Sequence, residues 1–179
     1  FRAFAGRYGG DGRVASVLFD LGETLFAMKD YGGALEAWTS CMGKNPPRSL
    51  AAKCALRIGD CRYYTHDFAS AAAVFGGFAG LYPESGLIDE AAYRQSLALE
   101  RLGRFDSSDS ILVELERKKG VAPGLRARML SRLSQRLRAK GRAADALPLL
   151  GELVSLDRTH ENLSAWGEAL FETGDFKQS

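Results

Sequence analysis

The sequence contains two histidines, and neither lies in a pattern that supports catalysis. A nucleophilic serine or cysteine needs a base within reach, and no such residue stands at a motif spacing from His66 or His160. The glycine-rich patterns that bind phosphate groups between a strand and a helix are also absent from the sequence. We therefore expect two surface histidines and a protein that is not an enzyme.

The three cysteines, Cys41, Cys54 and Cys61, lack the spacing of a metal site. Zinc sites usually contain a C-x2-C pair or combine cysteines with histidines, and this sequence has neither pattern. Cys54 and Cys61 would lie about 10 Å apart along one helix, too far for a disulfide bond. Cys41 could reach either of them, so a Cys41–Cys54 bond in an oxidising compartment and three packing thiols both stay open. No metal and no cofactor is expected.

Charge is distributed unevenly along the chain, although the net charge is only +2. Ten basic residues and no acidic one lie between Arg117 and Arg142, whereas residues 151–179 hold six acidic and two basic residues. The basic stretch is either a solvated face or a surface for an anionic partner. RNA is an alternative partner, because helical repeats of similar length bind single strands. The nearly neutral whole chain argues against it.

A repeat of 33 to 38 residues positions these side chains. The successive copies start at Ala15, Ala52, Asp89, Ala127 and His160. Two positions in every copy hold only Gly, Ala or Ser. They are the eighth (Gly22, Gly59, Ser96, Ser134, Gly167) and the twentieth (Ala34, Ala71, Ser108, Ala146, Ser179). Small residues at both positions let two helices approach closely, as in a helical hairpin.

Each copy also has two sets of apolar residues at helical spacing, which predict two amphipathic helices. A short turn is expected between the two helices, with glycine supplying a positive φ in three of the five copies. The turns are Lys29–Asp30, His66–Asp67, Gly103–Arg104, Gly141–Arg142 and Gly174–Asp175. Pro148 falls inside the second helix of the fourth copy, so we expect that helix to start late or to bend.

The pattern L-x2-L-G-x2-L…A-x3-W…P in residues 18–46 resembles the tetratricopeptide repeat (TPR) consensus, and residues 55–83 follow it less closely. The resemblance covers the whole chain and implies an all-α fold, a right-handed TPR superhelix of antiparallel helical hairpins. Residues 1–179 would then be one solenoid fragment. Its parts are a half repeat at 1–14, full repeats at 15–51, 52–88, 89–126 and 127–159, and a half repeat at 160–179.

The ends of the chain continue this pattern. Phe1-x2-Phe4-x3-Tyr8 matches Phe75-x2-Phe78-x3-Tyr82, so we expect a piece of a longer solenoid whose uncovered ends associate head to tail. The segment from Phe75 to Tyr82, with the proline that follows, is similar to bacterial TPR proteins of the periplasm and cell envelope. That resemblance implies the same location, with the cytoplasm as the alternative. No membrane span is expected, because the longest nearly apolar stretch has 12 residues and a span needs about 20.

The resemblance also implies where a partner would bind. Positions 2, 6, 9 and 13 of the first helices face away from the hairpin contact, and in TPR proteins that side lines a concave groove. The predicted partner-binding residues are Lys53, Arg57, Arg94, Arg128 and Arg132, together with Phe19, Tyr63, Tyr64 and Tyr93. Guanidinium groups bind carboxylates with two parallel hydrogen bonds, and aromatic side chains anchor interfaces.

The sequence therefore predicts a non-catalytic scaffold that binds a partner protein or an extended acidic peptide. In one alternative, the arginines only pair with nearby carboxylates, namely Glu23, Asp60, Glu90 or Glu100. RNA binding is a second alternative, and a role as the accessory domain of a larger enzyme is a third.

Overall fold

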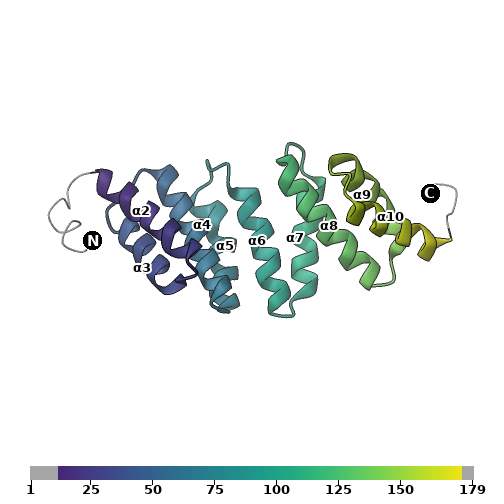
Figure 1. The fold of residues 1–179 in the computed structure, drawn as a ribbon, viewed down its shortest axis with the longest axis horizontal. Helices are drawn as coiled ribbons and strands as arrows, with labels where there is room; N and C mark the ends of the chain where they lie inside the picture. Colours follow the sequence, from purple (N-terminus) through teal and green to yellow (C-terminus); the bar gives the residue numbers. More distant parts are fainter. Residues whose placement is uncertain (1–11, 175–179) are drawn as a thin grey trace. The chain divides into compact units, whose positions relative to one another are not determined.

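The computed structural model describes residues 12–174, and these residues form nine α-helices and no strand (Figure 1). In chain order the helices are α2 (Gly12–Ala27), α3 (Tyr31–Met42), α4 (Arg48–Tyr64), α5 (Phe68–Leu81), α6 (Ile88–Arg101), α7 (Phe105–Arg117), α8 (Pro123–Ala139), α9 (Ala143–Leu156) and α10 (His160–Thr173). This confirms the all-α fold that the periodicity predicts.

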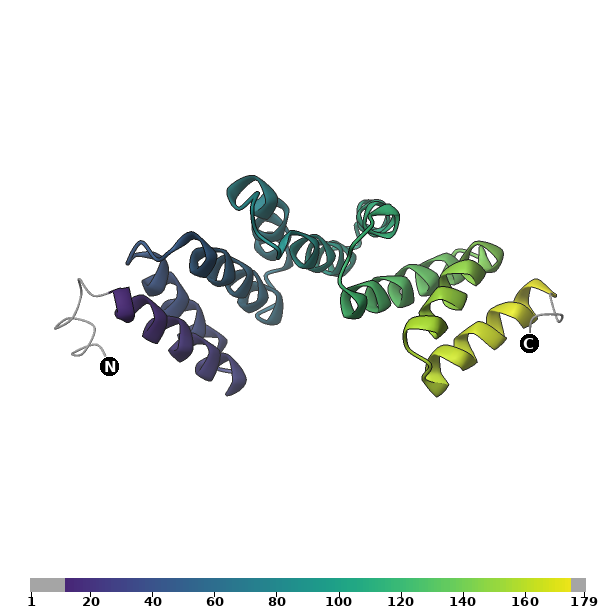
Figure 2. The same ribbon diagram turned by 90° about the horizontal axis from the view of Figure 1, so that it is seen from above.

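The chain divides into two compact units between Arg104 and Phe105. In the first unit α2 packs on α3, α3 on α4, α4 on α5 and α5 on α6. In the second unit α7 packs on α8, α8 on α9 and α9 on α10, and Figure 2 shows α8, α9 and α10 as a zigzag of antiparallel helices. The division falls inside the predicted repeat 89–126, between its two helices.

The predicted turns separate helices as expected. Lys29 and His66 have φ values of 63° and 65°, close to the 72° of Gly103 and Gly141 at the equivalent positions. Two non-glycine residues thus adopt the left-handed conformation that the sequence pattern assigns to glycine. In the first two copies an aspartate follows and caps the next helix; for example, the Asp30 carboxylate accepts a hydrogen bond of 2.9 Å from Gly33 N.

The small residues of the eighth and twentieth positions lie where paired helices touch. A Cβ atom on Gly59 would overlap the ring of Phe75, and one on Gly22 would overlap the ring of Trp38. The described twentieth-position side chains, Ala34, Ala71, Ser108 and Ala146, are fully buried. Gly167 differs, since a Cβ there would meet nothing within 4 Å among the described residues. Its predicted partner, Ser179, lies outside the described residues.

Helix α9 begins at Ala143, directly after its turn, and continues through Pro148 to Leu156. The structure therefore excludes the late start, and the alternative of a bend at Pro148 stays a prediction. Proline removes one hydrogen bond, but the apolar residues on both sides of it are buried and hold the helix in place. They are Ala143, Ala146, Leu150 and Leu153.

Two first helices begin four residues before the predicted repeat starts, α4 at Arg48 instead of Ala52 and α8 at Pro123 instead of Ala127. Prolines account for both starts. Pro47 is the N-cap of α4, and Pro123 is the first residue of α8, where its missing N–H group costs nothing. The extra turn of α4 supplies side chains to the site described next.

Candidate partner-binding site

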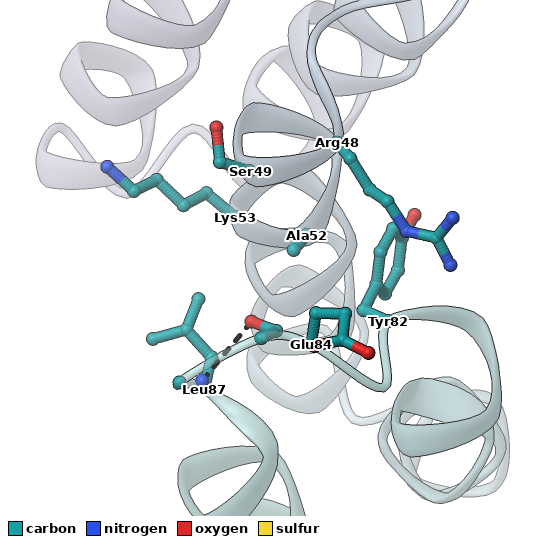
Figure 3. Close-up of a pocket in the computed structure, with 9 residues that line it drawn as sticks. Arg48, Ser49, Ala52, Lys53, Tyr82, Glu84 and Leu87 are labelled. Carbon is teal, nitrogen blue, oxygen red and sulfur yellow. Dashed lines mark hydrogen bonds between the residues drawn. The ribbon is translucent and has the colours of Figure 1, made fainter.

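A cavity of about 390 Å³ lies in the first unit, between the start of α4 and the loop that joins α5 to α6 (Figure 3). The residues that line it are Arg48, Ser49, Ala52, Lys53, Tyr82, Glu84, Ser85, Gly86 and Leu87. Helix α4 thus forms one wall, and residues 82–87 form the other. The Leu87 N–H group donates to Ser85 Oγ at 3.2 Å and holds the loop in its folded form.

Two cationic side chains extend from α4 on different sides of this cavity. Arg48 runs alongside the Tyr82 ring (Figure 3) and donates to the Leu81 carbonyl oxygen at 2.9 Å. Lys53 is exposed and extends in the other direction. Burial raises the pKa of the Tyr82 phenol, which stays neutral at physiological pH. Glu84 supplies the one carboxylate, so the lining carries two positive charges and one negative charge.

Lys53 is the only residue of the predicted site that lines this cavity. Sequence reasoning missed Arg48 because it placed the repeat start at Ala52. The Pro46–Pro47 pair is the signal that could have found it, since prolines commonly mark the residues just before a helix begins.

Arg57 and Arg94 belong to a different arrangement, a chain of ion pairs along α2, α4 and α6. Arg57 contacts Glu23 at 2.7 Å (Nη2 to Oε2) and Asp60 at 3.4 Å (Nη1 to Oδ2). Arg94 contacts Asp60 through Nη1 and Glu90 through Nε, the latter at 2.9 Å. Three carboxylates therefore surround two guanidinium groups. This series of ion pairs links α2, α4 and α6, the first helices of three successive repeats.

The central carboxylate of this chain, Asp60, is buried, with 8% of the residue exposed. Burial raises the pKa of the Asp60 carboxyl above its ordinary value, although Arg94 and Arg57 act in the opposite direction. The side chains of Arg57 and Arg94 are 33% and 22% exposed. A partner's carboxylate would therefore have to share guanidinium groups that already bind acids of this chain.

The arginine pairing follows the repeat register. Each of the two arginines contacts the acid at position nine of the preceding repeat, Glu23 for Arg57 and Asp60 for Arg94. Leu97 occupies position nine in the repeat before Arg132, so the third arginine has no acid at the equivalent place in the sequence. In the second unit Arg132 is half-buried and Arg128 is exposed.

An aromatic cluster covers the turn side of the first unit. The rings of Tyr31 and Tyr64 stack with centroids 5.3 Å apart and an interplanar angle of 12°. Tyr63 lies edge-on to Tyr64 at 5.8 Å and to Phe68 at 5.3 Å. Tyr64 is 52% exposed and offers part of its ring to solvent. The two predicted tyrosines thus lie together, at the end of α4 opposite to the cavity.

Phe19 and Tyr93, the other two predicted aromatic residues, contribute to the core. Tyr93 is 8% exposed. The Phe19 ring packs near Trp38 with centroids 6.4 Å apart, and Trp38 Nε1 donates to the Phe19 carbonyl oxygen at 3.1 Å. Tyr93 therefore leaves little surface for a partner, whereas Phe19 is half-buried and keeps part of its surface accessible.

The basic stretch between Arg117 and Arg142 is partly compensated by acids of the second unit. At least five of its ten basic side chains form ion pairs within the second unit. The pairs are Arg126 with Glu152, Arg136 with Asp109, Arg138 with Glu168 and Glu172, Lys140 with Asp106 and Asp109, and Arg142 with Asp145. The uneven distribution of charge along the sequence is therefore partly explained by ion pairs between basic and acidic residues within the second unit.

Neither a metal centre nor a membrane span is found in the described part of the chain. No group of three or more His, Cys, Asp or Glu side chains within residues 12–174 is arranged to hold a metal ion. None of the helices in that range is long and apolar enough to cross a bilayer.

No protein-family model matches the chain, and no characterised protein sequence is significantly similar to it. Solved structures with a similar fold are found. MamA from Desulfovibrio magneticus RS-1 is 16% identical, with a TM-score of 0.69, and the match covers 94% of this chain and 89% of MamA. The TPR-like repeats of a kinesin light chain from Podosopora anserina are 13% identical, with a TM-score of 0.68 over 93% of this chain and 90% of that one.

A third similar structure is YrrB, described as a TPR protein with an unusual peptide-binding site. It is 13% identical, with a TM-score of 0.66, and the match covers 99% of this chain and 85% of YrrB. At these identities the likeness concerns the fold. Together with the helical hairpins and the two columns of small residues, it shows that the chain has the tetratricopeptide-repeat fold.

Proposed function

We propose that the chain is a non-catalytic scaffold whose first unit binds an extended, acidic segment of a partner protein at the cavity beside α4. The observation that carries this proposal is the cavity itself, with Arg48 and the exposed Lys53 on its α4 wall. A carboxylate that enters it meets Lys53 without displacing an ion pair of the Glu23–Asp60–Glu90 chain. The peptide-binding site described for YrrB supports a role of this kind for the fold.

The cavity wall also suits the stem of a peptide side chain. Tyr82 and Leu87 offer apolar surface opposite α4, while Ser49 offers a hydroxyl group (Figure 3). Binding sites of this type combine an apolar wall with a few polar groups that set orientation. We assign Lys53 the main electrostatic contact, because Arg57 and Arg94 are held by internal carboxylates. Tyr64 is a second contact if the partner extends along α4 toward the turn.

The predicted site residues of the second unit, Arg128 and Arg132, also carry guanidinium groups that suit carboxylates, and they stay in the proposal as contacts of an acidic segment at that unit. RNA is the competing ligand. The ion pairs of the basic stretch oppose RNA binding, because a nucleic-acid partner would have to replace Glu152, Asp109 and Glu172 at their arginines. A location in the periplasm or cell envelope also stays a proposal, and cell fractionation of the tagged full-length protein tests it.

The test is fluorescence anisotropy with a labelled glutamate-rich peptide and a matched peptide that has glutamine in place of glutamate. We expect the glutamate peptide to bind more tightly, and Lys53→Glu to weaken its binding by about tenfold or more. The control is Lys29→Glu, which makes the same charge change at an exposed turn residue and should leave binding unchanged. Added salt should weaken binding in the unmodified protein.

Equal affinities for the two peptides, or equal losses of affinity in Lys53→Glu and Lys29→Glu, would show that the cavity is not the binding site for an acidic peptide. Displacement of the peptide by single-stranded RNA at lower concentration would favour the nucleic-acid alternative instead.

A further inference from the structure

Two of the three cysteines are in direct contact in the core of the first unit. Cys54 Sγ of α4 donates a hydrogen bond of 3.4 Å to Cys41 Sγ of α3, and Cys41 Sγ donates to the Ala15 carbonyl oxygen at 3.1 Å. Both thiols are fully buried, in a cluster that also contains Trp38 and Cys61. All three cysteines are free thiols in this structure.

We propose that Cys41 and Cys54 are a disulfide-forming pair that joins α3 covalently to α4 in the presence of a peroxide. The two sulfur atoms need to approach by about 1.3 Å to reach the length of a disulfide bond. They lie on adjacent helices that pack together, so a side-chain rotation and a small helix shift suffice. Cys61 lies two helical turns after Cys54 on the same helix, too far for a bond between those two residues.

The reaction balances with hydrogen peroxide as the two-electron oxidant. A thiolate sulfur attacks one peroxide oxygen, the O–O bond breaks, and a sulfenic acid and hydroxide form. The second thiol then attacks the sulfenic sulfur, the S–O bond breaks, and water leaves as the S–S bond forms. The two thiol protons end in the two water molecules, and the peroxide is reduced by the two electrons that the thiols lose.

Burial raises the pKa of both thiols. Either thiol can attack the peroxide first, and the other then resolves the sulfenic acid. Because both sulfur atoms are shielded from solvent, the reaction proceeds through brief local opening of the first unit and is slow.

The bond would tie the first repeat to the second. It closes the loop of residues 41–54, which contains the turn before α4 and the Arg48 and Lys53 side chains of the cavity. Closing a loop of this length restricts the unfolded chain, so we expect the oxidised protein to melt about 5 to 10 °C higher than the reduced protein.

Mass spectrometry of the full chain tests the proposal. The reduced, folded protein is treated with hydrogen peroxide, unfolded, and alkylated with iodoacetamide. We expect the loss of the mass of two hydrogen atoms and a single alkylated thiol, against three in untreated protein. Trypsin cuts between the pair at Lys44, Arg48 and Lys53, so the bond appears as two peptides joined through Cys41 and Cys54.

Three variants identify the pair. Cys61→Ala should retain the mass loss and the rise in melting temperature on oxidation, whereas Cys41→Ala and Cys54→Ala should abolish both. The melting comparison is made within each variant, oxidised against reduced, so that a loss of stability from the substitution itself does not matter. The oxidation is repeated in urea below the unfolding transition, where local opening is more frequent. Three alkylated thiols under both conditions, or a bond that involves Cys61, would overturn the proposal.

Discussion

Gly59 and Gly77 are glycines inside neighbouring helices, and only one of them is required by packing. A Cβ on Gly59 would overlap the Phe75 ring, whereas a Cβ on Gly77 would meet nothing within 4 Å. Replacing a helical glycine by alanine favours the helix by about 0.5 to 1 kcal/mol in both cases. At Gly59 the overlap costs about 1 to 3 kcal/mol and outweighs this gain.

We therefore expect Gly77→Ala to raise the free energy of unfolding and Gly59→Ala to lower it. Urea denaturation followed by circular dichroism measures both effects, and Gly77→Ala is the control because it makes the same chemical change in α5. Changes of the same sign in the two variants would mean that the small residue at position eight does not mark the contact between paired helices.

At this scale the sequence predicts the small residues well and the arginines poorly. The position of Gly59 follows from periodicity, since a small residue, Gly or Ser, returns at the eighth position of each repeat. The position of Asp60 between Arg57 and Arg94 depends on how one first helix lies beside the next, which periodicity does not specify. The pairing of these arginines with acids is one of the alternatives that the sequence leaves open, and the structure shows it for Glu23, Asp60 and Glu90.

Among the helices, α7 and α8 are connected by ion pairs that make the second unit sensitive to acid. Burial alone would raise the pKa of Asp109, but its contacts with Lys140 (2.7 Å) and Arg136 (3.0 Å) outweigh burial, and its pKa is lowered. The hydrogen bond from Arg126 likewise lowers the pKa of Glu152. Both carboxyl groups release their protons more easily in the folded protein than in the unfolded chain.

The sign of the pH effect follows. A carboxyl group whose pKa is lowered on folding contributes stability that is complete above its ordinary pKa, 3.8 for Asp and 4.5 for Glu. That contribution is lost as the pH falls through the lowered value. We expect the free energy of unfolding to decrease between about pH 6 and pH 3. Asp109→Asn should be less stable at the upper pH and lose less on acidification.

Urea denaturation at both pH values measures this difference. Asp106→Asn is the matched control, because Asp106 also approaches Lys140, at 3.3 Å, but its side chain is 99% exposed. Its removal should change neither the stability nor the acid response by much. If Asp109→Asn lost as much stability on acidification as the unmodified protein, Asp109 would not be a source of the pH dependence.

Helix boundaries show the same limit of sequence reasoning at the scale of elements. The turns at Lys29 and His66 were predicted from the register alone, because two helices of fixed length must be joined there. The early start of α4 was not predicted, since the repeat pattern begins at Ala52 and the prolines before Arg48 act only locally. The cavity depends on that extra turn, so the sequence located Lys53 but not the wall around it.

For the molecule as a whole, the repeat predicts successive hairpins but not the division after Arg104. A period shows that similar units follow one another, whereas the strength of each contact depends on the side chains that meet. The repeat in which the division falls departs from the apolar pattern, with Gln95 at a position that is apolar in the TPR consensus. The repeat register therefore continues through Arg104 and Phe105, although the chain divides into two compact units there.

Self-association is the prediction that belongs to the whole molecule. Helix α10 packs on α9 and presents two large apolar side chains to solvent, Phe171 (74% exposed) and Leu163 (37% exposed). Phe1 and Phe4, the residues expected at the other end of such a contact, lie outside the described residues. If α10 of one molecule docks on the start of another, the contact does not close on itself and association continues with concentration.

We therefore expect the average molecular mass measured by sedimentation to rise with protein concentration. At the same concentration, Phe171→Glu should have a lower average mass than the unmodified protein. A charge at that position opposes burial of the helix face. The control is Met28→Glu, which places the same charge on another exposed apolar residue, 72% exposed, at the α2–α3 turn. It should leave the concentration dependence unchanged. A constant monomer mass in the unmodified protein, or the same fall in both variants, would show that α10 does not serve as a docking face.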